Sequence, residues 1–149
     1  MHYFQINSKN SKPIVCIKQS TYMWYISWLS ALSACYIYYR NYNLYALLPA
    51  AIFLTSINYW KHPTYGFRRN LDISCSFSVI SLLYILAFNG SERIRFYILM
   101  TLAVSCYPVS IYIYNNNMHY VSTLVHSYIH IFGNMATFVL FSGYMPSIL

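Results

Sequence analysis

The sequence predicts an all-α fold, a polytopic transmembrane helical bundle of about five spans. Hydrophobic residues make up 58% of the 149-residue chain and charged residues only 7%. A soluble domain usually carries about 25% charged residues, so this chain has too few to cover a water-facing surface. Apolar runs of spanning length recur along the chain and are separated by short polar segments. We therefore expect the lipid bilayer to be the solvent for most of the protein.

The expected elements follow in chain order. Residues 1–19 are polar and basic and predict an N-terminal tail, and residues 20–149 predict a single transmembrane bundle. The apolar segments cover residues 21–39, 44–60, 71–88, 94–114 and 119–140. Each segment has 17 to 22 residues, close to the ~20 residues that a helix needs to cross the hydrocarbon core. Pro49 falls within the second segment, where a membrane helix tolerates a kink.

The basic residues predict an N-terminus in the cytoplasm. With five spans, the N-terminal tail, the 61–70 connection and the 115–117 turn share one side, which holds six of the nine Lys and Arg residues. The other side holds Arg40, Arg93 and Arg95. Cytoplasmic loops carry the excess of Lys and Arg in membrane proteins. The net charge of +7 does not indicate nucleic-acid binding, because the basic residues lie between apolar runs, as interfacial anchors do.

A polar stripe runs through the last apolar segment. Its members are His119, Thr123, His126, His130, Asn134 and Thr137. His126 and His130 are four residues apart, so both imidazoles lie on one helix face. Ionisable groups inside a span are costly, face the bundle interior, and mark functional sites.

The predicted topology places further candidate ligands on the same side of the membrane as this stripe. His62 follows the second segment, and Asp72 opens the third. Three imidazoles suit a zinc ion, and a catalytic zinc keeps its fourth position for a water molecule. A carboxylate such as Asp72 can hold that water and accept its proton. His119 is the alternative to His62 as the third ligand.

These residues resemble the pattern of alkaline ceramidases, within a wider superfamily of membrane hydrolases that includes the adiponectin-receptor type. The resemblance consists of a polar residue, Asn58, four before His62, then Asp72, and a final His126-x-x-x-His130. It implies a zinc-dependent hydrolase of lipid amides or esters, in which the three histidines bind Zn²⁺ while Asp72 and Asn58 assist catalysis. The family has serine where this chain has Asn58, and seven spans where this chain predicts five.

Other interpretations of the same residues stay open at this point. His126 and His130 could form interhelical hydrogen bonds, and Asp72 could cap its helix or pair with Arg68 or Arg69. The alternative function is a non-enzymatic multi-pass membrane protein, such as a small channel, a transporter subunit or an assembly factor. In that case the histidines would serve packing or a proton path.

Overall fold

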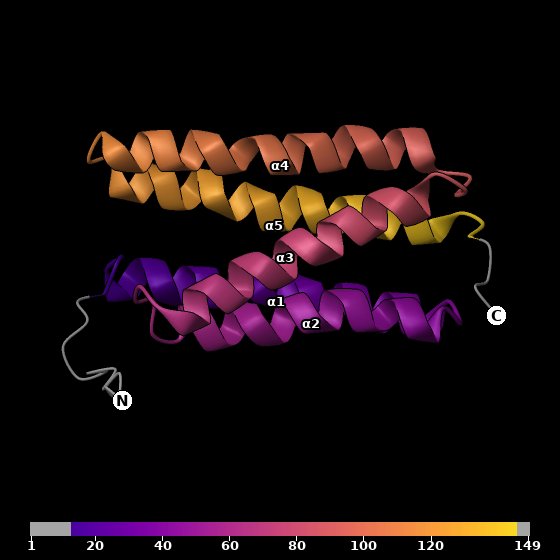
Figure 1. The fold of residues 1–149 in the computed structure, drawn as a ribbon, viewed down its shortest axis with the longest axis horizontal. Coiled ribbons are helices and arrows are strands. Elements are labelled where there is room, and N and C mark those ends of the chain that lie inside the picture. Colours follow the sequence, from indigo (N-terminus) through magenta and orange to yellow (C-terminus); the bar gives the residue numbers. More distant parts are fainter. Residues whose placement is uncertain (1–12, 146–149) are drawn as a thin grey trace, which may run out of the picture.

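The computed structural model describes residues 13–145, which form five helices joined by short connections (Figure 1). They are α1 (Ile17–Tyr39), α2 (Asn43–Trp60), α3 (Phe67–Ala87), α4 (Arg93–Asn115) and α5 (His119–Ser142). No strand occurs within the described range. The predicted all-α class is confirmed for this part of the chain, whereas most of the predicted N-terminal tail (residues 1–12) lies outside it.

The bundle consists of two helical hairpins with α3 crossing between them (Figure 1). α1 packs along α2, α4 packs along α5, and α5 also packs on α1. α3 packs mainly on α2 and makes few contacts with α4. The N-terminal ends of α1, α3 and α5 lie together at one end, which we call the basic end because it carries Lys18, Lys61, Arg68 and Arg69.

The bundle buries small polar side chains and exposes large apolar ones. Phe77, Ile85 and Ile98 are 73%, 69% and 58% exposed. The buried polar side chains include Ser27, Ser30, Ser33, Ser56, Ser127 and Asn134. Soluble proteins usually keep large apolar residues inside and polar ones outside. In lipid, small polar residues instead let helices approach closely and hydrogen-bond to each other.

Three helices of the described range, α3, α4 and α5, are long and apolar enough to cross a membrane. This finding supports the expectation of a multi-pass membrane protein. α1 and α2, with 23 and 18 residues, are of spanning length but are not among these three helices. The prediction of five spans therefore stays a prediction for the first hairpin.

Two helices begin earlier than the sequence predicts. α1 starts at Ile17, inside the predicted tail, because the Gln19 side chain accepts a hydrogen bond from the Cys16 backbone N–H (3.1 Å) and caps the helix. α3 starts at Phe67 because the chain breaks at Gly66, whose φ of 133° suits glycine. Asp72 consequently lies in the second turn of α3 and does not open the helix.

The apolar core lies toward the end opposite the basic end. Val79, Leu83, Phe96, Met100 and Leu140 are buried there in one cluster from α3, α4 and α5. Closer to the basic end, α3 crosses away from α4, and a smaller buried cluster contains Met23, Tyr59 and Trp60. The candidate functional site lies beside the larger core, since Val79, Leu83 and Met100 line it.

Candidate functional site

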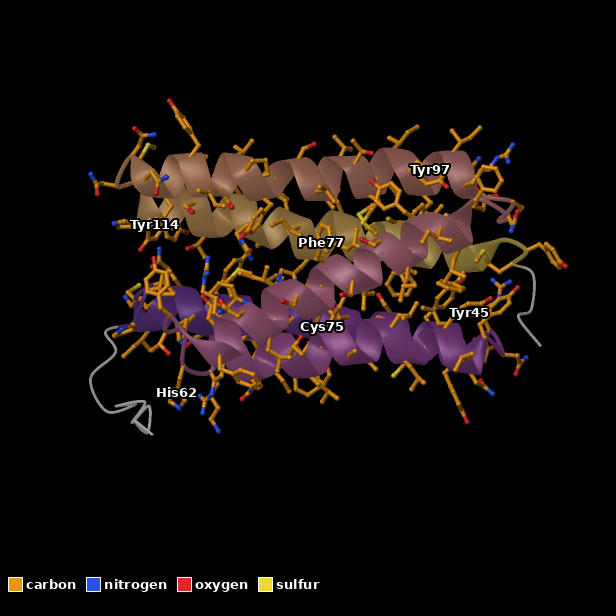
Figure 2. The ribbon with its side chains drawn as sticks, in the orientation of Figure 1. Tyr45, His62, Cys75, Phe77, Tyr97 and Tyr114 are labelled. Carbon is orange, nitrogen blue, oxygen red and sulfur yellow. The ribbon has the colours of Figure 1, made fainter. Side chains whose placement is uncertain are left out.

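A cavity of about 450 Å³ lies between α3 and the α4–α5 hairpin. All five helices contribute to its wall, with α3 and α5 supplying the most residues. The wall is mainly apolar and includes Phe77 of α3, which is labelled in Figure 2. Asp72, His126 and His130 all line the cavity. The structure therefore brings together three of the predicted site residues.

Asp72 is held by hydroxyl groups from α2. Its Oδ1 atom accepts hydrogen bonds from Ser56 Oγ (2.7 Å) and Thr55 Oγ1 (3.0 Å). Ser56 is only 1% exposed, so this carboxylate is anchored from inside the bundle. Two charge-assisted hydrogen bonds offset part of the cost of placing a carboxylate in an apolar wall.

The two simpler roles of Asp72 are both wrong. The N-cap of α3 is Gly66, and the first turn of this helix contains no acidic residue. Within residues 13–145 the one ion pair is Arg95–Glu92 (3.2 Å), so Asp72 pairs with neither Arg68 nor Arg69. Asp72 instead joins α3 to α2.

The two histidines of α5 lie side by side on the cavity wall. Their ring centroids are 5.9 Å apart, which agrees with the predicted shared helix face. His126 also packs edge-on against Trp60 (5.6 Å) and Tyr107 (6.3 Å). Neither imidazole takes part in a hydrogen bond with another residue of the described range, so the proposed role as interhelical hydrogen-bonding residues is not observed. Both rings keep their nitrogens available to a molecule in the cavity.

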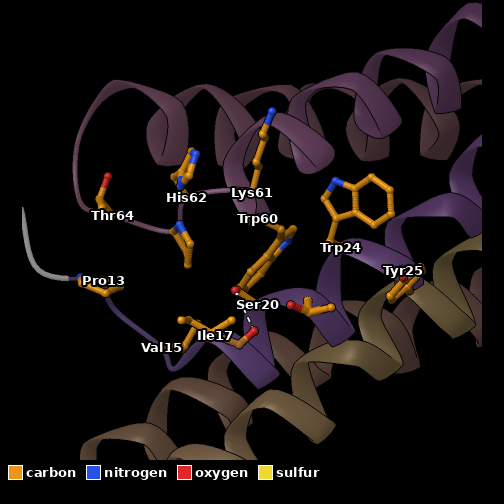
Figure 3. Close-up of a pocket in the computed structure, with 12 residues that line it drawn as sticks. Pro13, Val15, Ile17, Ser20, Trp24, Tyr25, Trp60, Lys61, His62 and Thr64 are labelled. Atoms are coloured by element: carbon orange, nitrogen blue, oxygen red, sulfur yellow. Dashed lines mark hydrogen bonds between the residues drawn. The ribbon is translucent and has the colours of Figure 1, made fainter.

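His62 lies apart from the two histidines of α5. It is exposed in the α2–α3 connection and projects from the side of the bundle away from α4 and α5 (Figure 2). It lines a different cavity of about 630 Å³ at the basic end, together with Trp24, Lys61 and Trp60 (Figure 3). Since Trp60 also packs against His126, its indole ring stands between this cavity and the α5 histidines.

Neither of the other predicted site residues joins the cavity. Asn58 is exposed, whereas Ser56, two residues earlier on α2, makes the contact with Asp72. His119 is exposed at the first turn of α5 and packs on Tyr114, with ring centroids 4.6 Å apart. Within residues 13–145, no group of three or more His, Cys, Asp or Glu side chains is placed to hold a metal ion. The described residues therefore do not fit a three-ligand zinc site.

Asn134 connects the polar stripe of α5 to α1. Its Oδ1 atom accepts a hydrogen bond from Ser33 Oγ (2.6 Å), and its Nδ2 atom donates to Ser30 Oγ (3.3 Å) and to the backbone oxygen of His130 (2.7 Å). Tyr22 and Ser127 hydrogen-bond across the same interface (3.1 Å). The stripe thus has two roles: Asn134 joins helices, and the histidines face the cavity.

The serine and threonine side chains that hydrogen-bond to Asp72 and Asn134 were not among the predicted site residues. Ser27, Ser30 and Ser33 recur every three residues in α1, a spacing that places them on one helix face and could have predicted the contact with α5. The ceramidase resemblance has a serine at the position of Asn58, and Ser56 is the nearby serine of this chain, but its contact with Asp72 depends on how α2 and α3 cross.

A second, smaller cavity of about 230 Å³ adjoins the first at the basic end. Asp72, Ile73, Tyr107 and His126 line both cavities. Arg69 lines only the smaller one, where its guanidinium lies over the ring of Tyr65 (5.4 Å). The two cavities therefore meet at Asp72 and His126, with an apolar space on one side and a cation on the other.

Comparisons of the chain with protein-family models, curated proteins and solved structures gave no match. The resemblance to alkaline ceramidases therefore stays a prediction that rests on its motif residues alone.

Proposed function

We propose that this protein is a five-span integral membrane protein that binds a lipid-like molecule between α3 and α5. The observation that carries the proposal is the cavity of about 450 Å³, with a mainly apolar wall and three ionisable residues on it. Small-molecule sites are typically apolar spaces of ~300–1,000 Å³ with a few placed polar groups. A lipid can reach the cavity sideways from the bilayer, because α3 makes few contacts with α4.

A substitution that fills the cavity tests this proposal. Ser76 lines the cavity, whereas Ser78 lies two residues later on α3 and is exposed. In the purified protein, Ser76→Phe should abolish retention of co-purified lipid measured by native mass spectrometry, and Ser78→Phe should retain it. Equal lipid content in the parent and both variants would contradict binding in this cavity.

The proposed topology has five spans and a cytoplasmic N-terminus. It is supported by the placement of residues 13 and 145 at opposite ends of the bundle and by the excess of Lys and Arg at the basic end (Figure 1). Single cysteines introduced at Asn41, Thr64 and Asn116 into a cysteine-free chain test it. Thr64 and Asn116 should be labelled from the cytoplasmic side and Asn41 from the other. If Asn41 is labelled from the same side as Thr64, the first hairpin does not cross the membrane.

A zinc-dependent lipid hydrolase is the second candidate function. It is favoured by the presence of His126, His130 and Asp72 in the lining of one cavity. It requires a third histidine ligand besides His126 and His130. His62 does not supply it in this structure, because Trp60 lies between His62 and the histidines of α5. Elemental analysis after purification without chelators decides the question. About one zinc ion per chain, lost in His126→Ala and His130→Ala but kept in an Asn58→Ala control, would favour the hydrolase.

A further inference from the structure

We propose that the bound lipid has a single acyl chain and an anionic headgroup, and that Arg69 holds this headgroup in the smaller cavity. The inference rests on the proposed function and adds the chemical class of the ligand. It follows from three observations: the junction of the two cavities, the surroundings of Arg69, and the length of the combined space.

The different linings of the two adjoining cavities determine how a bound amphiphile is oriented. Both cavities have mainly apolar walls, but only the smaller one has an arginine side chain, Arg69, which lies beside Tyr59, Tyr65 and Asn115. An amphiphile that occupies both must therefore place its chain along α3 and α5 and its polar group at the basic end. The basic end is also where positively charged residues meet the membrane surface.

Arg69 is the cation that recognises the headgroup. Its side chain is half-buried on the cavity wall and lies near the phenol of Tyr59 and over the ring of Tyr65. It forms no ion pair with a residue of the described range, whereas Arg95 at the other end pairs with Glu92. The nearest acid, Asp72, is engaged by Ser56 and Thr55. A planar guanidinium in this position matches a phosphate or carboxylate group by paired hydrogen bonds.

The combined space has the length of one acyl chain. Along α5 it extends from Ser122, in the smaller cavity, to Thr137, in the larger one. These residues are separated by about 22 Å at 1.5 Å per residue. One leaflet contributes ~15 Å of hydrocarbon, half of the ~30 Å core. A single extended chain with its headgroup is therefore long enough to span both cavities.

Asp72 lies at the junction, where the headgroup meets the chain. Because it is a carboxylate that accepts hydrogen bonds, it favours a hydroxyl or amide N–H on this part of the lipid. A lysophospholipid with a phosphate monoester supplies each feature: the anion, the adjacent glycerol hydroxyl, and one chain.

Matched probe lipids and matched variants test the inference. The full-length protein in detergent is titrated with 1-oleoyl lysophosphatidate and with monoolein, which has the same chain and glycerol but no phosphate. We expect at least about tenfold tighter binding of lysophosphatidate, since charge-assisted hydrogen bonds carry this much discrimination. Arg69→Gln should remove the preference. Arg68→Gln should keep it, because the adjacent Arg68 is exposed and lines neither cavity.

The outcomes separate this inference from the proposed function. If the parent binds both lipids equally, or if Arg68→Gln loses the preference as Arg69→Gln does, the headgroup assignment is wrong while lipid binding stands. If the parent binds neither lipid, the proposed function fails as well. Oleate, tested in parallel, tells whether the site takes any anion or only a phosphate. Retained binding of monoolein by Arg69→Gln shows that this variant is folded.

Discussion

The two sides of α5 differ in how they meet their neighbours. Toward α1, α5 forms a close interface in which Ser30 and Ser33 hydrogen-bond to Asn134. Toward α3, the same helix faces a cavity, and His126 and His130 make no hydrogen bonds within the described range. Asn134 uses its polar group to join α5 to α1 although it also lines the cavity, whereas His126 and His130 line the cavity without such bonds. A single polar stripe on a helix can therefore combine residues that join helices with residues that only line a cavity.

The largest expected effect on stability comes from a larger side chain in the close interface between α1 and α5. Ser33→Leu should destabilise the protein by about 2–3 kcal/mol, because Ser33 is fully buried and its loss also leaves Asn134 without a donor. Unfolding by sodium dodecyl sulfate in mixed micelles measures the change. Ser78→Leu, on the exposed face of α3, is the control and should leave stability unchanged. Comparable stability of the two variants would contradict a close α1–α5 interface.

Removal of the amide that joins α5 to α1 should have a smaller effect. Asn134→Leu should cost about 1–2 kcal/mol, since interhelical hydrogen bonds in membranes average ~0.6 kcal/mol and Asn134 makes two of them to α1. A double-mutant cycle with Ser33→Ala isolates the coupling between the two side chains. A coupling energy of zero would mean that this hydrogen bond does not stabilise the interface.

The hydrogen bonds from α2 to Asp72 should contribute still less to the stability of the protein. Ser56→Ala removes one of two hydrogen bonds to the carboxylate and should cost about 0.5–1.5 kcal/mol in the same unfolding assay. Asn58→Ala is the matched control, because Asn58 is exposed and two residues away. A larger loss of stability in Asn58→Ala than in Ser56→Ala would contradict Ser56 as the partner of Asp72. It would favour Asn58, the residue that the ceramidase resemblance indicates.

The smallest change in stability should follow from a larger side chain in the cavity between α3 and α5. Ser76→Phe projects into the cavity and should change the free energy of unfolding by less than ~0.5 kcal/mol, although it removes bound lipid. Its contrast with Ser33→Leu measures the difference between the two sides of α5 directly. A loss of stability as large as that of Ser33→Leu would mean that α3 closes on α5 in the membrane.

The helical segments and the shared face of His126 and His130 could be predicted from the sequence, because hydropathy and helical spacing are local properties. The helix starts were wrong where a local cap extends the helix, as Gln19 does for α1 and Gly66 for α3. The position of His62 could not be predicted either, because it depends on the path of a connection and on the placement of Trp60.

The site as a whole depends on how the helices cross. Asp72 was recognised as a candidate from its charge, but its bond to Ser56 follows from the contact between α2 and α3. The cavity itself exists because α3 leaves α4 near the basic end. No residue pattern within one helix specifies this separation, since it results from the packing of all five.

The hydrogen bonds between α1 and α5 have a consequence for biosynthesis. Ser33 and Asn134 are 101 residues apart in sequence. Because the chain is synthesised from its N-terminus, α1 is made long before its polar partner on α5 exists. Serine can meanwhile bond to its own helix, as Ser27 does with the backbone oxygen of Met23 (2.9 Å). Among the described helices α5 is made last and completes the bundle, so a nascent chain arrested before α5 has neither the α1–α5 interface nor the cavity.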